Sequence, residues 1–217
     1  MLLKELRKEV CWGNFLLPEK GLVAWTSGNV SARDKKTGYV VVKPSGVSYE
    51  DLTPAKLLVV DLNSKVIEGK LKPSVDTLTH LYIYRHRPDV NSVVHTHSPY
   101  ATSFAVIGKP IPVCMTGQAD EFGMPVPIAP FARIGTEAIG KLVVKYIGKS
   151  IAILLKNHGV FTIGKNVRGA VKAAVMLEEI AKTYHLALMK GKPIKIPDSE
   201  VEKLYRRYQE KYGQEYP

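Results

Sequence analysis

The sequence predicts an α/β fold, one domain over residues 1–217 in which helices flank a central, largely antiparallel sheet. Strand-like runs occur in hairpin pairs with helices between them, instead of strict strand–helix–strand alternation, and this favours a layered fold around an antiparallel sheet. No Pro/Gly-rich linker, internal repeat or low-complexity segment divides the 217 residues. That length suits a single hydrophobic core.

Short apolar runs bounded by turn residues predict the strands. The first two flank a turn at Lys35 to Gly38, and the next two form a hairpin across Asn63-Ser64. The last two are buried runs, SIAILLK and VFTI, joined through Asn157-His158-Gly159. In chain order the expected strands are 24–32, 39–43, 57–61, 65–68, 91–97, 112–115, 150–156 and 160–163.

Helical spacing of apolar residues predicts the other elements. The first helix has Leu2, Leu6 and Val10 among its apolar positions, and we expect Pro18 to end that segment. The second stops at Pro88, because proline disfavours the helical conformation of the residue before it. In chain order the expected helices are 2–16, 76–87, 99–107, 135–147, 166–190 and 198–211.

Composition narrows the class of protein. Hydrophobic residues are 45% and charged residues 24%, as in an ordinary soluble globular protein. No apolar run approaches the ~20 residues that cross a bilayer, and the N-terminus lacks the apolar core of a signal peptide. The two cysteines, Cys11 and Cys114, make no disulfide framework. We therefore expect a cytoplasmic protein with reduced thiols and no membrane partner.

The formal net charge of +11 allows two interpretations. One is nucleic-acid binding. However, the basic residues are dispersed along the chain, and the densest clusters, 4–8 and 203–211, also carry glutamates. We interpret the charge as a basic surface that attracts anionic metabolites, and we expect no nucleic-acid partner.

A pair of histidines gives the strongest chemical signal. His95 and His97 end an apolar strand, and side chains two residues apart in a strand share one face, so both imidazoles can bind one metal ion. His158, in a turn between two buried strands, adds a third imidazole. Three neutral imidazoles leave an open coordination position, the pattern of a catalytic zinc that acts as a Lewis acid. We assign structural or surface roles to the histidines on expected helices, His80, His86 and His185.

Asp76 has two interpretations at this stage. It follows Ser74, which suits a helix N-cap, so Asp76 can be a first-turn acid that favours the helix dipole. The functional interpretation is a fourth metal ligand or a base beside the metal. Asp120 and Tyr212 also have two interpretations. Asp120 can be an ordinary turn residue and Tyr212 an ordinary tail residue, and sequence spacing does not connect either one to the histidines.

Three segments suit a bound phosphate, because exposed backbone N–H groups and hydroxyls bind it without a P-loop. They are 26–31 (TSGNVS), 43–46 (KPSG) and the helix start at Pro73-Ser74. Each alone is a weak signal, since Ser-Gly turns are common in plain loops. Together they make three candidate phosphate contacts.

With these motifs the chain resembles the class II aldolase family of sugar-phosphate enzymes, and within it the L-ribulose-5-phosphate 4-epimerase group. The His-x-His pair with Asn-His-Gly is strong for the whole family. Asp76, Asp120 and the terminal Tyr-Gly-Gln point to the epimerases. The resemblance runs through TSGNVSA (26–32), KPSGV (43–47), KPSVDTLTH (72–80), VVHTHSPYAT (93–102), TGQADEFG (116–123), NHGVFTIGKN (157–166), AVMLEEIA (174–181) and KYGQ (211–214).

The resemblance implies a metal bound by His95, His97 and His158, with Asp76 as a further ligand. Zn²⁺ is the expected cofactor, and Mn²⁺ or another divalent metal is the alternative. Substrate contacts are expected at Gly28, Asn29, Lys43, Ser45, Gly46, Ser74, Val75 and Thr116.

The resemblance also implies acid/base roles for Asp120 and Tyr212. Tyr212 would reach in from a neighbouring subunit of a homotetramer whose active sites lie between subunits. Two departures from the epimerase pattern stand out. Val75 replaces a usual second serine, which removes a hydroxyl from the phosphate site, and the helix before Tyr212 is shorter, so that an expected histidine falls near Leu204.

The resemblance implies an isomerase of arabinose metabolism that interconverts L-ribulose 5-phosphate and D-xylulose 5-phosphate. Because C4 is not next to the carbonyl, it has no easy carbon-acid route. A retro-aldol cleavage of C3–C4, rotation of the aldehyde and re-addition would invert it. The first alternative is a lyase of the L-fuculose-1-phosphate aldolase type, which releases the aldehyde. The second is a non-catalytic, adducin-head-like binding domain, against which the intact histidine triad speaks.

Overall fold

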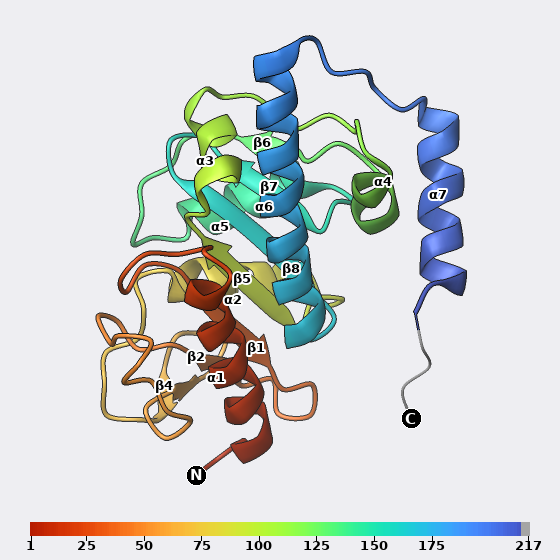
Figure 1. The fold of residues 1–217 in the computed structure, drawn as a ribbon. Coiled ribbons are helices and arrows are strands. Elements are labelled where there is room, and N and C mark those ends of the chain that lie inside the picture. Colours follow the sequence, from red (N-terminus) through yellow and green to blue (C-terminus); the bar gives the residue numbers. More distant parts are fainter. Residues whose placement is uncertain (214–217) are drawn as a thin grey trace.

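The computed structural model of the chain describes residues 1–213. Its strands are β1 Asn29–Arg33, β2 Val40–Val42, β3 Leu58–Val60, β4 Val66–Glu68, β5 Ser92–Thr96, β6 Ile128–Ala129, β7 Ala152–Leu155 and β8 Gly159–Gly164. They form one sheet in the order β4-β3-β2-β1-β5-β8-β7-β6 (Figure 1). All neighbouring strands are antiparallel except the parallel pair β6–β7. The predicted α/β fold around a largely antiparallel sheet is confirmed.

Helices lie on both faces of this sheet. They are α1 Lys4–Glu19, α2 Thr77–His86, α3 Pro99–Val106, α4 Thr116–Phe122, α5 Ala138–Ile147, α6 Val167–Lys190 and α7 Asp198–Lys211. The helices α1, α3 and α6 pack on one face, and α2 and α5 pack together against the other. Within residues 1–213, no helix is both long and apolar enough to span a bilayer.

Because helices cover both faces of the sheet, strands such as β2 are apolar along their whole length. In β2, Val40 and Val42 join the core beneath α2 and α5, whereas Val41 packs with α1 and α6. Successive side chains of a strand point to opposite faces, so a strand covered on both sides needs apolar residues throughout. In β5 the same alternation sends Val93 to the α2/α5 side. His95 shares that side, and its ring stacks on Phe161 with centroids 4.3 Å apart.

Several element predictions were wrong in detail. The strand expected at 24–32 begins only at Asn29, because 24–28 forms a turn in which Trp25 and Gly28 have φ of 55° and 74°. The strand expected at 112–115 is replaced by an isolated bridge between Ile111 and Val126. Helix α4 follows and was not predicted, since TGQADEF has a glycine in its first turn and too few apolar residues to show a period. The two-residue strand β6 was also missed.

Helix α1 runs past the proline that was expected to end it. Pro18 lies in the last turn of α1, where its missing N–H removes only one of the final hydrogen bonds. The helix closes when the Lys20 N–H donates to the carbonyl oxygen of Leu16. The prediction erred because proline disrupts a helix less at its end than in its interior.

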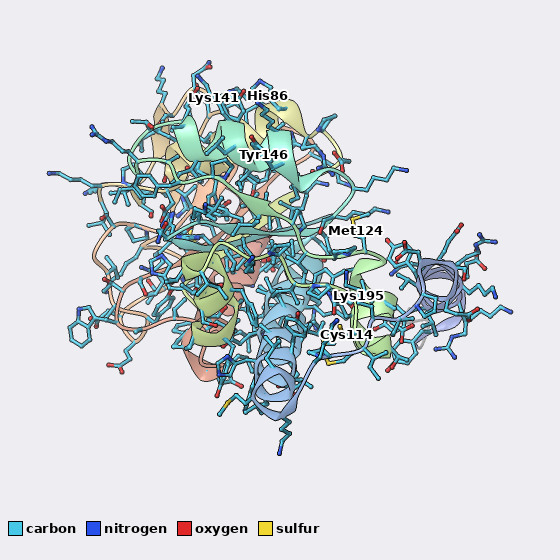
Figure 2. All side chains as sticks on the ribbon, turned by 90° about the horizontal axis from the view of Figure 1, so that it is seen from above. His86, Cys114, Met124, Lys141, Tyr146 and Lys195 are labelled. Carbon is cyan, nitrogen blue, oxygen red and sulfur yellow. The ribbon has the colours of Figure 1, made fainter. Side chains whose placement is uncertain are left out.

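The C-terminal helix α7 stands to one side of the sheet, beyond α4, when the molecule is seen from above (Figure 2). It docks mainly on α4. The Tyr205 ring packs so closely on Gly123 that an added Cβ there would lie 2.7 Å from it. Lys172 of α6 reaches α7 through a hydrogen bond from Nζ to the Tyr208 hydroxyl, 3.0 Å long. The structure thus separates α7 from the strand ends that carry the histidines.

Candidate metal centre

Two neighbouring strands bring the three histidines together. His95 lies in β5, and His97 follows the strand end. The antiparallel partner β8 begins directly after the turn that carries His158. In that turn Asn157 has a φ of 58°, a left-handed conformation that asparagine tolerates better than most residues. The turn therefore places the His158 ring beside the other two, with ring centroids 4.8 Å from His95 and 5.3 Å from His97.

The ring nitrogens converge on one point. One ligand atom from each of the three histidines lies within 4.8 Å of the others. His95 Nδ1 is 2.9 Å from the carbonyl oxygen of Val160, so this nitrogen carries the proton and Nε2 keeps its lone pair. His97 Nε2 lies 3.0 Å from that His95 Nε2, and His158 Nδ1 is buried without a hydrogen-bond partner.

Gly159 is what allows this approach. A Cβ added there would lie 2.5 Å from the carbonyl oxygen of Thr96 and 2.7 Å from Cδ2 of His97. Backbone cannot move aside cheaply at such a distance. Any larger residue at 159 would push the His158 turn away from β5.

Burial keeps these imidazoles neutral. It lowers the pKa of His95 to about 3, although the nearby Asp76 opposes this shift. Burial also lowers the pKa of His97 and of His158. Neutral imidazoles are the form that binds a metal ion.

Asp76 lies beside the histidines at the start of α2. Asn29 donates from Nδ2 to Asp76 Oδ2 over 2.8 Å. Burial alone would raise the pKa of the Asp76 carboxyl, but His95, His80 and the hydrogen bond from Asn29 bring that pKa below its ordinary value. The side chain is therefore an anion facing neutral imidazoles. Its carboxylate is not among the three converging ligand atoms, so its place as a fourth ligand stays a prediction.

A pocket of about 230 Å³ opens in front of the histidines. Two segments form much of its wall; we call 26–29 the first cradle segment and 43–46 the second cradle segment. The expected contacts Gly28, Asn29, Lys43, Ser45, Gly46, Ser74 and Val75 all line this pocket, together with Asp76 and the three histidines. Ile134 also lines it and was not predicted, because an isoleucine in a loop gives no chemical signal.

Two of these lining residues, Val75 and Lys43, need a separate description. Val75 is 56% exposed and lines the pocket, and its part in binding the phosphate stays a prediction. Lys43 is almost wholly buried, and its Nζ donates to the carbonyl oxygen of Thr26 over 3.3 Å. Burial lowers the pKa of Lys43, while the charge of Asp76 opposes the shift. The lysine thus lies in the wall of the site instead of extending freely into it.

Thr116, Asp120 and Tyr212 do not line the pocket of their own chain. Thr116 begins α4, and Asp120 of the same helix lies 3.8 Å from Arg207 of α7. Tyr212 is 73% exposed and stacks on Tyr208. Gln214 of the terminal motif lies outside the described residues. Any contact of Thr116, Asp120 or Tyr212 with a histidine site would have to come from another subunit.

The donor set fits a divalent metal. One ring nitrogen from each histidine lies within 4.8 Å of the others, so all three can share one cation. His158 Nδ1 is also buried without a hydrogen-bond partner. Three neutral imidazoles are a set that Zn²⁺ accepts, with a position left for substrate. A carboxylate beside them adds the negative charge that a divalent cation favours.

Comparison with known proteins defines the class. Residues 8–185 match the Class II Aldolase and Adducin N-terminal domain family, and the chain belongs to this family. A solved L-fuculose 1-phosphate aldolase shares 30% identity with a TM-score of 0.92, over 96% of this chain and 98% of that one.

Two other solved structures extend the comparison. A putative aldolase/epimerase/decarboxylase from Escherichia coli, YgbL, shares 26% identity with a TM-score of 0.82, over 93% of this chain and 98% of its own. An l-fuculose-1-phosphate aldolase from Thermus thermophilus shares 26% identity with a TM-score of 0.73, over 87% of this chain and 98% of its own. The family resemblance predicted from the sequence is confirmed.

Proposed function

We propose that this chain is a metal-dependent enzyme that cleaves the C3–C4 bond of a ketose phosphate by a retro-aldol reaction. The observation that supports this best is the convergence of His95, His97 and His158 in one pocket with two cradle segments. A divalent metal bound there would polarise the ketose carbonyl and stabilise the negative charge left when the C–C bond breaks. The cradle segments would bind the phosphate.

The chain's own groups have separate tasks in this proposal. The anionic Asp76, fixed by Asn29, either completes the ligand set or takes the proton from the C4 hydroxyl. The backbone and hydroxyls of Gly28, Ser45 and Ser74 face the phosphate oxygens. Binding the phosphate fixes the substrate so that the carbonyl meets the histidine end of the pocket.

The fate of the aldehyde defines two candidate activities, and we place the aldolase first. The chain is similar to an L-fuculose 1-phosphate aldolase over nearly the whole of both chains. Asp120 and Tyr212, on which an epimerase would depend, lie outside the pocket of their own chain. The epimerase, acting on L-ribulose 5-phosphate, is the second candidate, supported by the presence of both residues in their motifs. It requires Tyr212 to enter a neighbouring site in a homotetramer.

Product analysis tests the proposal. The purified protein is loaded with Zn²⁺ or Mn²⁺ and given L-fuculose 1-phosphate or L-ribulose 5-phosphate. An aldolase yields dihydroxyacetone phosphate from the 1-phosphate, because C1 to C3 leave together. An epimerase yields D-xylulose 5-phosphate of unchanged mass. Both activities should disappear after chelation and return with the metal.

Two results would contradict the proposal. Activity that survives complete metal removal would exclude the metal chemistry. A protein that carries one metal per chain yet converts neither substrate, nor other ketose phosphates, would favour the non-catalytic binding domain.

A further inference from the structure

Three consecutive carbonyl oxygens of the first cradle segment accept hydrogen bonds from one neighbouring stretch of chain. Lys43 Nζ donates to the carbonyl oxygen of Thr26. The Tyr49 hydroxyl lies 2.7 Å from the carbonyl oxygen of Ser27 and 2.9 Å from that of Gly28, and its single proton is shared between them. Both donors belong to the stretch that contains the second cradle segment. The two segments are therefore joined by side chain as well as by proximity.

These bonds fix the orientation of the peptide planes. The C=O and N–H of one peptide unit point in opposite directions. Because the carbonyl of Ser27 points to Tyr49, the N–H of Gly28 points away from it, and Gly28 itself lines the pocket. Gly28 has a φ of 74°, and an added Cβ would lie 2.8 Å from the carbonyl oxygen of His95. This backbone has little freedom to turn once the tyrosine bond is made.

The surroundings of Tyr49 suit a fixed donor. Its side chain is 5% exposed, and Lys43 Nζ lies 4.9 Å from the centre of its ring. Burial raises the pKa of the Tyr49 hydroxyl, which therefore keeps its proton at neutral pH. A buried hydroxyl whose single proton is shared between two carbonyls has no proton left to donate to a substrate.

We propose that Tyr49 is a positioning residue that locks the two cradle segments into one phosphate-binding site. It touches neither the reacting atoms nor the metal ligands, and acts only through the backbone of 27–28. The inference rests on the proposed function in one respect, that the pocket binds a phosphate group. It adds a residue that no sequence motif marked.

Binding of inorganic phosphate to the metal-loaded protein tests this without any need for turnover. Tyr49→Phe removes the hydroxyl alone and leaves the buried carbonyl of Gly28 and the partly buried carbonyl of Ser27 without this donor. We therefore expect the Kd for phosphate, measured by calorimetry, to rise about tenfold. Tyr84→Phe is the matched control. Tyr84 is also buried, but its hydroxyl bonds Ser31 behind the site, so its Kd should equal that of the wild type.

A second measurement uses the wild type alone. Phosphate should slow amide exchange in both cradle segments together, because Tyr49 couples them. An unchanged Kd in Tyr49→Phe, equal losses in both tyrosine variants, or protection of one segment only would overturn the inference. A wild type that fails to bind phosphate would also overturn it. A third outcome separates the two proposals. If the wild type binds phosphate and Tyr49→Phe does not, but the wild type cleaves no ketose phosphate, the proposed function is wrong and the inference stands.

Discussion

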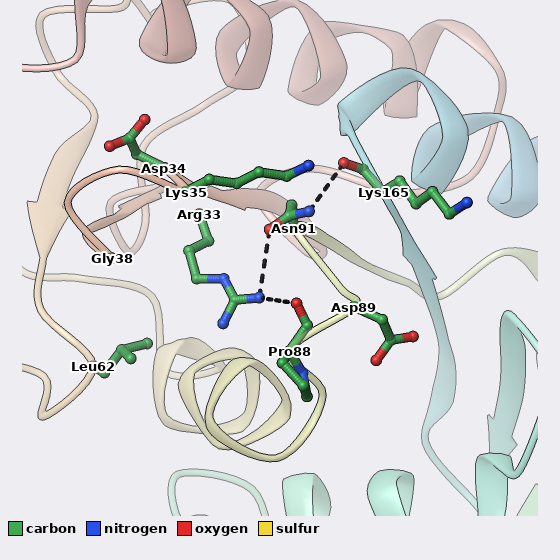
Figure 3. Close-up of a pocket in the computed structure, with 9 residues that line it drawn as sticks. All are labelled: Arg33, Asp34, Lys35, Gly38, Leu62, Pro88, Asp89, Asn91 and Lys165. Atoms are coloured by element: carbon green, nitrogen blue, oxygen red, sulfur yellow. Dashed lines mark hydrogen bonds between the residues drawn. The ribbon is translucent and has the colours of Figure 1, made fainter.

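The strands β1, β5 and β8 carry polar side chains at both ends, and the two ends differ in how fully these groups satisfy one another. One end holds Asn29, His95 and the His158 turn around the pocket of about 230 Å³. The opposite end holds Arg33, Asn91 and Lys165 around a larger hollow of about 530 Å³ (Figure 3). By volume alone, the second hollow would be the stronger candidate for a ligand site.

Hydrogen bonding favours the histidine end as the ligand site instead, because the polar groups at the opposite end already bond one another. The Arg33 guanidinium donates to the carbonyl oxygens of Tyr84, Pro88 and Val90 over 2.9, 2.8 and 2.6 Å. Asn91 accepts from Arg33 and donates to the carbonyl oxygen of Lys165 (Figure 3). At the histidine end, by contrast, His95 Nε2 and His97 Nε2 face each other, and His158 Nδ1 is buried without a hydrogen-bond partner. Unmet bonding capacity, more than volume, distinguishes a site for a ligand from a well-braced strand end.

The largest expected effect is at the histidine end. His97→Ala should remove the tightly bound metal and lower kcat by roughly 10⁴-fold or more, since a metal supplies several kcal/mol of charge stabilisation. Metal content by mass spectrometry and the rate with the active substrate are the measurements. Asn91→Ala, at the other end of the same strand region, is the control and should keep both. Full metal occupancy in a His95→Ala, His97→Ala double variant would refute the site.

A second prediction tests whether Tyr212, which lies away from the histidine end of its own chain, takes part in the reaction. Tyr212→Phe removes only a hydroxyl, so folding and metal content should persist. If the chain acts as the epimerase, loss of an acid/base group donated by a neighbouring subunit should lower kcat by roughly 10²–10⁴. Asp120→Asn and Tyr212→Phe chains should regain partial activity when unfolded together and reassembled. Full activity in Tyr212→Phe would remove the support for the epimerase.

The two ends should also differ in their response to acid. Burial lowers the pKa of His80, next to the site, from its ordinary value of 6.5 to about 4 in the folded chain. The unfolded state then binds more protons, so stability is complete above pH ~6.5 and falls as the pH drops toward ~4, by up to about 1.4 kcal/mol per unit for each such histidine. Urea unfolding of the metal-free protein at pH 7.5 and 5.0 measures this. A His80→Gln variant should lose part of the dependence; equal slopes would contradict the prediction.

The end that holds Arg33, Asn91 and Lys165 should matter for stability and hardly at all for turnover. Arg33→Met leaves three carbonyls without a charged donor, so we expect a loss of about 2–3 kcal/mol, or roughly 5–10 °C in Tm for a domain of this size. KM and kcat should stay within about twofold at a temperature where the variant is folded. A large fall in kcat with little change in Tm would mean that this hollow takes part in the reaction.

The smallest effect is expected at the rim of the pocket. Val75→Ser restores a hydroxyl, which should lower KM for the sugar phosphate by about two- to fivefold, less than a fully buried charged hydrogen bond would give. Val75→Ala, which shortens the side chain without adding a donor, is the matched control. A KM that rises or stays level in Val75→Ser would place Val75 outside the phosphate contacts.

Local pattern was enough to predict much of this molecule from its sequence. The two-residue spacing of His95 and His97 fixes a shared face whatever the rest of the chain does, and Gly159 marks the tight turn after His158. The consecutive valines of β2 and β5 were equally readable as buried strand. These features depend on neighbours along the chain, where periodicity is a direct consequence of backbone geometry.

The remainder depends on contacts between distant segments. No pattern in the sequence relates Tyr49 to the carbonyls of 27–28, or Ile134 to the pocket, because each is an ordinary residue until the fold places it. Helix α4 packs against α7, a contact between distant segments that local propensity does not register. The roles of Asp120 and Tyr212 stay predictions for a related reason, since within one chain they lie away from the histidines.

The pairing of β5 with β8 sets the order of events during folding. The three imidazoles meet only after these strands, distant in the chain, have come together, and such non-local pairings form late and slowly. A cation that binds there cannot guide the early steps. It should instead lengthen the lifetime of the folded chain, so that added cation lowers the unfolding rate and leaves the refolding rate unchanged.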